Sequence, residues 1–163
     1  MALSLSARMG SERIKSCFAL YPAAQLTDPE RLATVMGCVS DEFRSGVVIP
    51  HWSMKLFINA YTTPGTDMND PRLSPIFYDA SKFPKYVAVA CGDADTLYHM
   101  SFAFMKKISG SASGTNVDGS RRFICVPNEA HEFNTFWTTR ESREQRDLVE
   151  GEAIRMIRAS WSQ

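Results

Sequence analysis

Residues 86–95 read Tyr-Val-Ala-Val-Ala-Cys-Gly-Asp-Ala-Asp, and this stretch is the clearest sign of the fold class. Its first six residues are apolar without interruption. A strand with one solvated face would alternate apolar and polar residues, so the run predicts a strand buried on both faces. Gly92 and Asp93 then mark a turn. Buried strands of this kind are typical of parallel sheets that carry helices on both sides.

Two further apolar runs predict two more strands of the same sheet. The first run covers residues 17–21 of a strand expected over 14–21, the second covers residues 123–126, and each is closed by a proline. Amphipathic helices are expected from about Thr96 and over residues 141–161, because apolar residues recur there at helical spacing. We therefore expect an α/β fold in which a parallel sheet is flanked by helices.

Residues 27–82 are the least regular part of the chain and predict a helical, cap-like insertion between the first two strands. Helices are expected near Pro29 and Pro50. Dense turn signals over residues 62–82 predict an ordered surface loop. The segment 52–58 is apolar on more than one face. It fits either a buried helix or a lid or pocket wall that faces an apolar ligand.

Two shorter segments also have clear local patterns. Residues 2–9 predict a helix that ends at Gly10. Residues 109–120 are rich in serine and glycine and predict a flexible surface linker.

The composition describes one soluble globular domain and argues against two classes of partner. The chain has 163 residues, and its 18 Lys and Arg balance its 18 Asp and Glu. This balance leaves no basic stripe for a phosphate backbone, so we expect no nucleic-acid partner. The longest apolar runs are far shorter than the roughly 20 residues that a membrane span requires. The first eight residues lack the basic and long apolar regions of a secretory signal, so none is expected.

The four cysteines are widely separated and form no C-x-x-C pair. Together with the absence of metal-ligand spacing among the histidines, this predicts no zinc site, no redox dithiol and no cofactor. We expect Cys17, Cys38, Cys91 and Cys125 to be buried and reduced. Such cysteines suit an intracellular chain and favour the cytoplasm as its compartment.

Two polar clusters follow the second and third predicted strands, at residues 92–95 and 128–132. Reactive groups of parallel α/β sheets gather beyond the carboxyl ends of the strands. If the two strands are neighbours, Asp95 and His131 meet at this edge. A carboxylate beside an imidazole fixes its tautomer and favours the imidazolium, so the pair could activate a hydroxyl or a thiol.

Simpler roles compete with catalysis at both positions. Asp95 stands just before Thr96, where the N-cap of the following helix belongs. His131 could be an ordinary surface loop residue. His51, in the helix after Pro50, and His99, off the apolar stripe of its helix, are weaker candidates.

Four stretches of the sequence carry a family resemblance. They are Asp-Pro-Arg-Leu-Ser-Pro at 70–75, Phe-Pro-Lys-Tyr-Val at 83–87, Gly-Asp-Ala-Asp-Thr-Leu at 92–97 and His-Glu-Phe at 131–133. Together they resemble the second half of an α/β-hydrolase of the hormone-sensitive-lipase-like esterase group. Tyr21-Pro22 similarly resembles the end of the strand after the nucleophile helix.

This resemblance implies a carboxylic-ester hydrolase that needs no cofactor and no metal. Asp95 matches the acid of the D-x-L motif, with Asp93 as the second candidate, and His131 matches the base of the H-x-F motif. A small apolar ester would be the substrate. The segment 52–58 and the pair Phe136-Trp137 would help to line its pocket.

The chain departs from the family pattern at the nucleophile. Neither G-x-S-x-G nor H-G-G-G occurs in the sequence, although the family takes its serine and its oxyanion donors from these motifs. Residues 1–9 resemble the helix that directly follows the serine. We therefore expect residues 1–163 to form one partial α/β-hydrolase domain, with the insertion at 27–82 and the acid and histidine within 83–163.

Three functional hypotheses follow. The first is an esterase-like or lipase-like domain that is inactive alone. The second is a non-catalytic small-molecule-binding or degenerate remnant of such an enzyme, and the third is an unrelated α/β binding domain in which Asp95 caps a helix. Under the first two, the strand at 14–21 would expose an unpaired apolar edge. We then expect a homo-oligomer or a partner that covers this edge.

Overall fold

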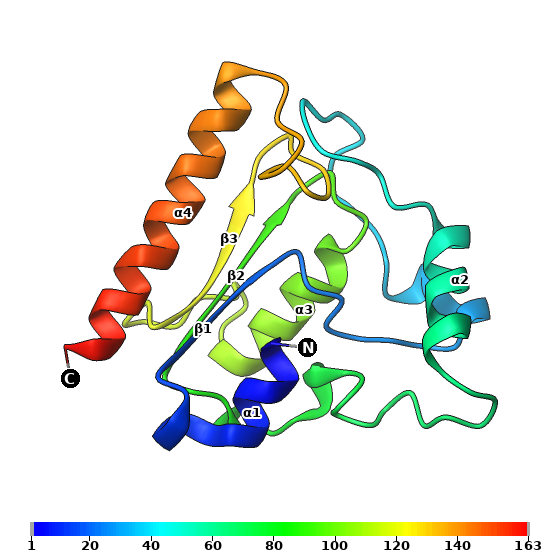
Figure 1. Cartoon of the computed structure of the whole chain (residues 1–163), viewed down its shortest axis with the longest axis horizontal. Coiled ribbons are helices and arrows are strands. Elements are labelled where there is room, and N and C mark those ends of the chain that lie inside the picture. The colour runs from blue at the N-terminus through cyan, green and yellow to red at the C-terminus, as the bar shows by residue number, and fades with distance from the viewer. Residues whose placement is uncertain (1, 163) are drawn as a thin grey trace.

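The centre of the molecule is a sheet of three parallel strands (Figure 1). The computed structural model describes residues 2–162. Strand β1 covers Ser16–Leu20, β2 covers Tyr86–Gly92 and β3 covers Arg121–Val126, in the order β1-β2-β3. Both pairings are parallel. The predicted α/β class, the three strands and the parallel sheet are therefore confirmed.

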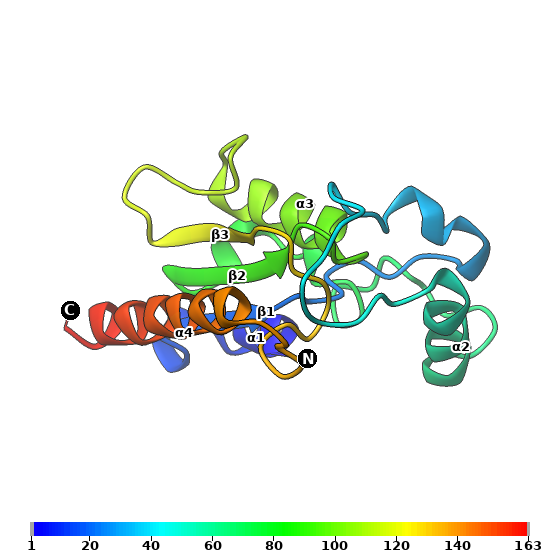
Figure 2. The same cartoon turned by 90° about the horizontal axis from the view of Figure 1, so that it is seen from above.

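Strand β2 is buried because helices cover both faces of the sheet. Residues 87–91 of this strand are at most 1% exposed. Helix α3 (Tyr98–Ser109) lies on one side of the sheet, and helix α4 (Arg140–Trp161) lies on the other (Figure 2). The side chains of Val87 and Val89 pack with α3, and that of Ala90 packs with Val149 of α4. The uninterrupted apolar run of β2 follows from this double cover.

The helices beside the sheet agree with their sequence patterns in position, with some differences in extent. Helix α1 covers Ala2–Arg13 and continues past Gly10, which forms a kink with φ 71° and ψ 172°. Helical spacing would turn five apolar residues of α4 toward the core, but of these Val149 and Met156 alone are buried, and Ala153, Ile157 and Trp161 are not. Trp161, at the end of α4, is 77% exposed.

The insertion between β1 and β2 contains helix α2, which covers His51–Tyr61, and three short 3₁₀ helices at Pro29–Thr34, Pro75–Phe77 and Ala80–Lys82. Helix α2 buries Met54 and Ile58 against Leu32, Leu97 and other residues of a second core cluster. The buried-helix interpretation of residues 52–58 is wrong, because this segment buries Met54 and Ile58 while Trp52, Leu56 and Phe57 are exposed.

Two expectations drawn from composition need correction. The serine-rich segment at 109–120 is folded onto β3, because Asn116 Oδ1 accepts a hydrogen bond from the backbone N–H of Arg121 and the Gly114 carbonyl accepts one from Phe123. All four cysteines are free, but only Cys17 and Cys91 are buried. Cys125 is exposed because β3 is an edge strand of the sheet, and Cys38 is half-buried.

Strand β1 is the other edge strand. Within residues 2–162 it pairs with β2 alone, so its second edge carries backbone groups without a sheet partner. The same described part of the chain contains no helix that is both long and apolar enough to span a membrane.

We expect Gly92→Ala to destabilise the fold by about 2 kcal/mol or more, the cost of overpacking against an atom that cannot move away. A Cβ at this position would lie 1.9 Å from the carbonyl oxygen of Glu129, which is backbone. Gly151→Ala is the matched control, because a Cβ there meets nothing within 4 Å.

Urea unfolding measures both variants. Gly151→Ala should stabilise the chain by up to about 1 kcal/mol, since alanine is the better helix former. Equal free energies of unfolding for Gly92→Ala and the unmodified chain would contradict this reading of the loop contact.

Candidate functional site

Asp95 and His131 meet beyond the carboxyl ends of β2 and β3. The Nδ1 atom of His131 lies 2.9 Å from Oδ2 of Asp95. The Asp95 side chain is fully buried, and the His131 side chain is 15% exposed. Because a carboxylate can only accept, the neutral histidine donates its Nδ1–H to Asp95. This leaves Nε2 as the basic nitrogen of the ring.

Asp95 serves two partners, one with each oxygen. Its Oδ1 accepts a hydrogen bond of 2.8 Å from the backbone N–H of Leu97, in the turn before α3. Its Oδ2 faces His131. The N-cap prediction for Asp95 is wrong, because α3 begins at Tyr98 and its N-cap residue is Leu97. Asp95 instead stabilises the turn before the helix with one oxygen and contacts the histidine with the other.

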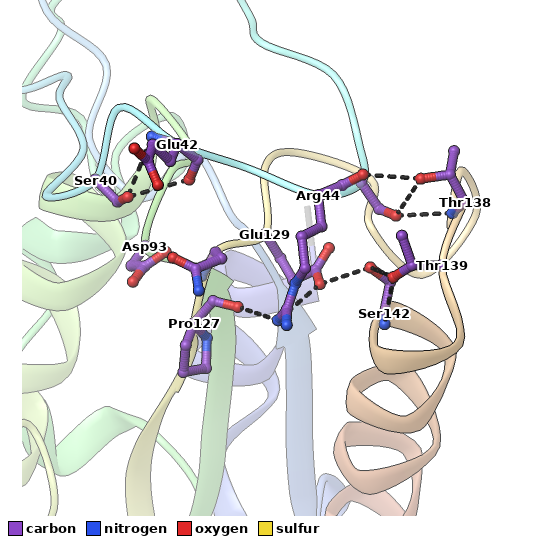
Figure 3. A network of polar contacts seen from close by, with 11 residues as sticks. Ser40, Glu42, Arg44, Asp93, Pro127, Glu129, Thr138, Thr139 and Ser142 are labelled. Carbon is purple, nitrogen blue, oxygen red and sulfur yellow. Dashed lines mark hydrogen bonds and ion pairs between the residues drawn. The ribbon is translucent and has the colours of Figure 1, made fainter.

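Asp93, the second candidate acid, is a link between loops. Its Oδ1 accepts a hydrogen bond of 2.6 Å from the backbone N–H of Asn128, and its carbonyl accepts from Val39 and Ser40. The first bond joins the loop after β2 to the loop after β3, and the other two join it to the insertion. Asp93 and its neighbours are drawn in Figure 3.

Tyr21 places an aromatic ring against the histidine. It directly follows β1, and its ring centroid lies 4.3 Å from that of His131. The hydroxyl donates to Oδ1 of Asn134 over 2.6 Å. Burial, and next the negative charge of Glu132, raise the pKa of the Tyr21 hydroxyl above its ordinary value.

Backbone strain gathers around the same edge of the sheet. Among the described residues, three positions other than glycine have positive φ, namely Tyr21 at 35°, Asn128 at 57° and Glu132 at 58°. Each lies in a loop that follows a strand of the sheet. Conformations of this type are costly and persist where surrounding contacts fix them, which is common at functional sites.

A segment of the insertion, which we call the strap (residues 39–48), crosses the two loops. Val47 and His131 exchange two backbone hydrogen bonds, of 2.7 and 3.0 Å, and the N–H of Ala130 donates to the carbonyl of Ser45 over 2.9 Å. The strap was missed at the sequence level. Val47, Val48 and Ile49 form a short apolar run, but nothing in that run indicates which residues it contacts.

A buried carboxylate lies two residues before His131. Glu129 is fully buried, and its Oε1 accepts from the Ser142 hydroxyl at 2.8 Å and lies 3.3 Å from Nη2 of Arg44. Its Oε2 has no hydrogen-bond partner among the described residues. Burial raises the pKa of the Glu129 carboxyl, and the contacts of Ser142 and Arg44 oppose that rise. The sequence placed Glu129 in the polar cluster at 128–132 but gave no sign that it is buried.

The other two histidines have no part in this arrangement. His51 is the first residue of α2 and is exposed, and His99 lies on α3 beside Gly37. Within residues 2–162, no group of three or more histidine, cysteine or acidic side chains could hold a metal ion.

The raised pKa of Glu129 leads to a pH prediction. The folded chain binds a proton at Glu129 more tightly than the unfolded chain does. This tighter proton binding stabilises the fold. The stabilisation is complete below pH 4.5, the ordinary pKa of the carboxyl, and is lost as the pH rises through the raised pKa of the folded chain. Gln cannot lose a proton, so the unfolding free energy of Glu129→Gln minus that of the unmodified chain should increase between about pH 4 and 8.

Urea unfolding at several pH values provides this difference. Glu144→Gln controls for the loss of one negative charge, because Glu144 lies exposed on α4 and pairs with Arg140. A difference for Glu129→Gln that stays constant or falls with pH would contradict the prediction.

Solved structures of other proteins contain a similar fold. The chain is similar to an esterase/lipase from an uncultured bacterium, with 14% identity and a TM-score of 0.61 over 99% of this chain and 50% of that one. It is also similar to brefeldin A esterase, a bacterial homologue of human hormone-sensitive lipase, with 19% identity and a TM-score of 0.59 over 96% and 42%. Carboxyl esterase 2 from the mycorrhizal fungus Tuber melanosporum gives 12% identity and a TM-score of 0.51 over 98% and 48%.

The chain spans half or less of the length of each of these structures. No curated protein matches the sequence. A family model described as the alpha/beta hydrolase fold matches residues 1–135, which is most of the chain. Together with the parallel sheet and its flanking helices, this match shows that the chain belongs to the α/β-hydrolase fold family.

Proposed function

We propose that this chain carries the acid and the base of a carboxylic-ester hydrolase of the esterase or lipase type. The observation that supports the proposal most is the 2.9 Å contact between His131 Nδ1 and Asp95 Oδ2. In the complete site, Nε2 of His131 would take the proton of a serine hydroxyl as that oxygen attacks the ester carbonyl. It would then return the proton to the departing alcohol.

Asp95 would orient the histidine throughout this cycle. Its carboxylate holds the ring with Nδ1–H directed at Asp95, so that Nε2 would be the nitrogen available to the reactants. The negative charge stabilises the imidazolium that forms when Nε2 is protonated. Full burial of the carboxylate strengthens this effect, because water screens the charge less in the interior.

The nucleophile and the oxyanion donors of this site would come from outside residues 1–163. G-x-S-x-G and H-G-G-G do not occur in the sequence, and the chain spans half or less of the esterases to which it is similar. Loss of the serine alone costs about 10⁶-fold in kcat in a triad hydrolase. Residues 1–163 alone would therefore hydrolyse no ester.

An apolar ester is the substrate class that we propose. Phe136 and Trp137 follow His131 closely and are 52% and 41% exposed. The uncovered face of α2 adds Trp52, Leu56 and Phe57. These side chains favour an acyl or alcohol group without charge, as a lid or wall of the pocket.

The open edge of β1 is where we propose that a partner, a second copy of the chain or further polypeptide packs. A groove of about 720 Å³ borders this edge, and its lining includes Phe18 and Leu20 of β1 and Leu3 of α1. Apolar side chains beside an unpaired strand edge are a known association hazard.

A non-catalytic, small-molecule-binding or degenerate domain is the second candidate. The missing serine motif favours it, because such a domain would keep the fold without the nucleophile. The coding sequence ahead of the Met1 codon separates the two. An in-frame G-x-S-x-G shortly before Met1 supports the esterase, and its absence supports the remnant.

The catalytic proposal predicts no turnover of a short-chain p-nitrophenyl ester by purified residues 1–163. A chain extended to include the serine should hydrolyse the same ester. In that extended chain, we expect Asp95→Asn to lower kcat by about 10⁴-fold and His131→Ala by about 10⁶-fold.

His99→Ala is the matched control for loss of an imidazole, since His99 lies on α3. Hydrolysis by residues 1–163 that disappears in His131→Ala would refute the inactivity of the chain. Full activity of the extended His131→Ala variant would refute the proposed base.

A further inference from the structure

We infer that the strap (residues 39–48) is the positioning element of His131, and that Arg44 and Gly46 are the residues that seat it. The inference rests on the proposed function in one respect, namely that His131 is the residue whose position matters. Its evidence is the set of contacts that the strap makes with the histidine loop and the acid loop.

The sheet itself does not hold the histidine in place. Strand β3 ends at Val126, so His131 lies beyond the last ladder hydrogen bond. Both backbone groups of His131 bond instead to Val47, and the preceding N–H of Ala130 bonds to the carbonyl of Ser45. The strap thus supplies the hydrogen-bond partners that fix the position of the His131 backbone, from which the imidazole side chain extends.

Arg44 anchors the strap to both ends of the histidine loop (Figure 3). Its Nη2 donates to the carbonyl of Pro127 over 2.8 Å and lies 3.3 Å from Oε1 of Glu129. The backbone N–H of Arg44 donates to the carbonyl of Asn128, and the carbonyl of Arg44 accepts from the Thr138 hydroxyl. Bonds of this kind to a charged donor are stronger than neutral ones.

The other end of the strap holds the acid loop. The N–H groups of Val39 and Ser40 donate to the carbonyl of Asp93, whose side chain accepts from Asn128. Asp93 is two residues before Asp95. One segment therefore contacts the loop of the acid and the loop of the base, and it can set their spacing.

Gly46 lies close against the backbone of Ala130 and His131, with no room for a side chain. A Cβ there would lie 2.4 Å from the carbonyl oxygen of His131 and 2.9 Å from the carbonyl carbon of Ala130, and φ is +95°. Only glycine fits such an approach to backbone. Gly65 has a similar φ of +84°, but a Cβ there would meet nothing within 4 Å.

The pair Gly46→Ala and Gly65→Ala therefore tests the contact at nearly equal backbone strain. The chain has three histidines, so their ring C–H resonances can be assigned by single substitutions. The ring of Tyr21 lies 4.3 Å from that of His131, and its ring current makes the His131 shift sensitive to ring position. Gly46→Ala should move the His131 resonances and leave those of His51 and His99 unchanged.

Amide hydrogen exchange on the full chain provides the second readout. In Gly46→Ala, exchange at the N–H groups of Ala130, His131 and Val47 should accelerate by about tenfold or more, as expected for the loss of a hydrogen bond. Exchange within β2 should stay unchanged. Gly65→Ala should show neither effect.

Arg44→Met tests the anchor without altering the backbone, which matters if Gly46→Ala fails to fold. We expect the same local acceleration and the same His131 shift, with partial recovery in Arg44→Lys because lysine retains the charge but not the fork of donors. Arg140→Met is the control, since Arg140 pairs with Glu144 on the exposed face of α4.

Selective changes at 130–131 and in the His131 ring would support the inference. It would be overturned if Gly46→Ala matched Gly65→Ala and Arg44→Met matched Arg140→Met, or if exchange accelerated equally in β2. Neither readout involves ester turnover. The strap inference can therefore fail while the esterase proposal stands, and the esterase proposal can fail while the strap inference stands.

Discussion

The parallel pairing of β2 with β3 is the constraint on which the rest of the structure depends. Its register sets Gly92 opposite Val126, so both strands end at the same edge and their loops leave the sheet side by side. The close approach of the Glu129 carbonyl to Gly92 is possible because Gly92 has no Cβ. The acid and the histidine meet because these two loops are neighbours.

The pairing of strands does not complete the site by itself. Buried Asp95 needs hydrogen-bond partners for its charge, and it finds them in the Leu97 N–H and the His131 ring. The histidine loop in turn needs backbone partners, which the strap provides. Two parts of the fold therefore have separate roles. The sheet brings the loops together, and the insertion between β1 and β2 fixes their conformation.

The sequence predicted the parts of the fold that local pattern determines. Uninterrupted apolar runs located all three strands, and helical spacing located α3 and α4. It also singled out Asp95 and His131, which the structure brings together. The contact of Arg44 with Glu129 could not be predicted, because it joins residues far apart in the chain and neither lies in a recognisable motif. The exposure of Cys125 was missed because an apolar run does not reveal whether its strand lies at the edge of the sheet.

The central claim is that this chain holds a preformed acid–base pair in which Asp95 orients His131. Long-range proton–nitrogen NMR spectra of the three histidine rings test it most directly, because they report which nitrogen of the neutral ring carries the proton. We predict that His131 carries its proton on Nδ1, bonded to Asp95, and leaves Nε2 free to act as a base. A neutral His131 with its proton on Nε2 would contradict the claim.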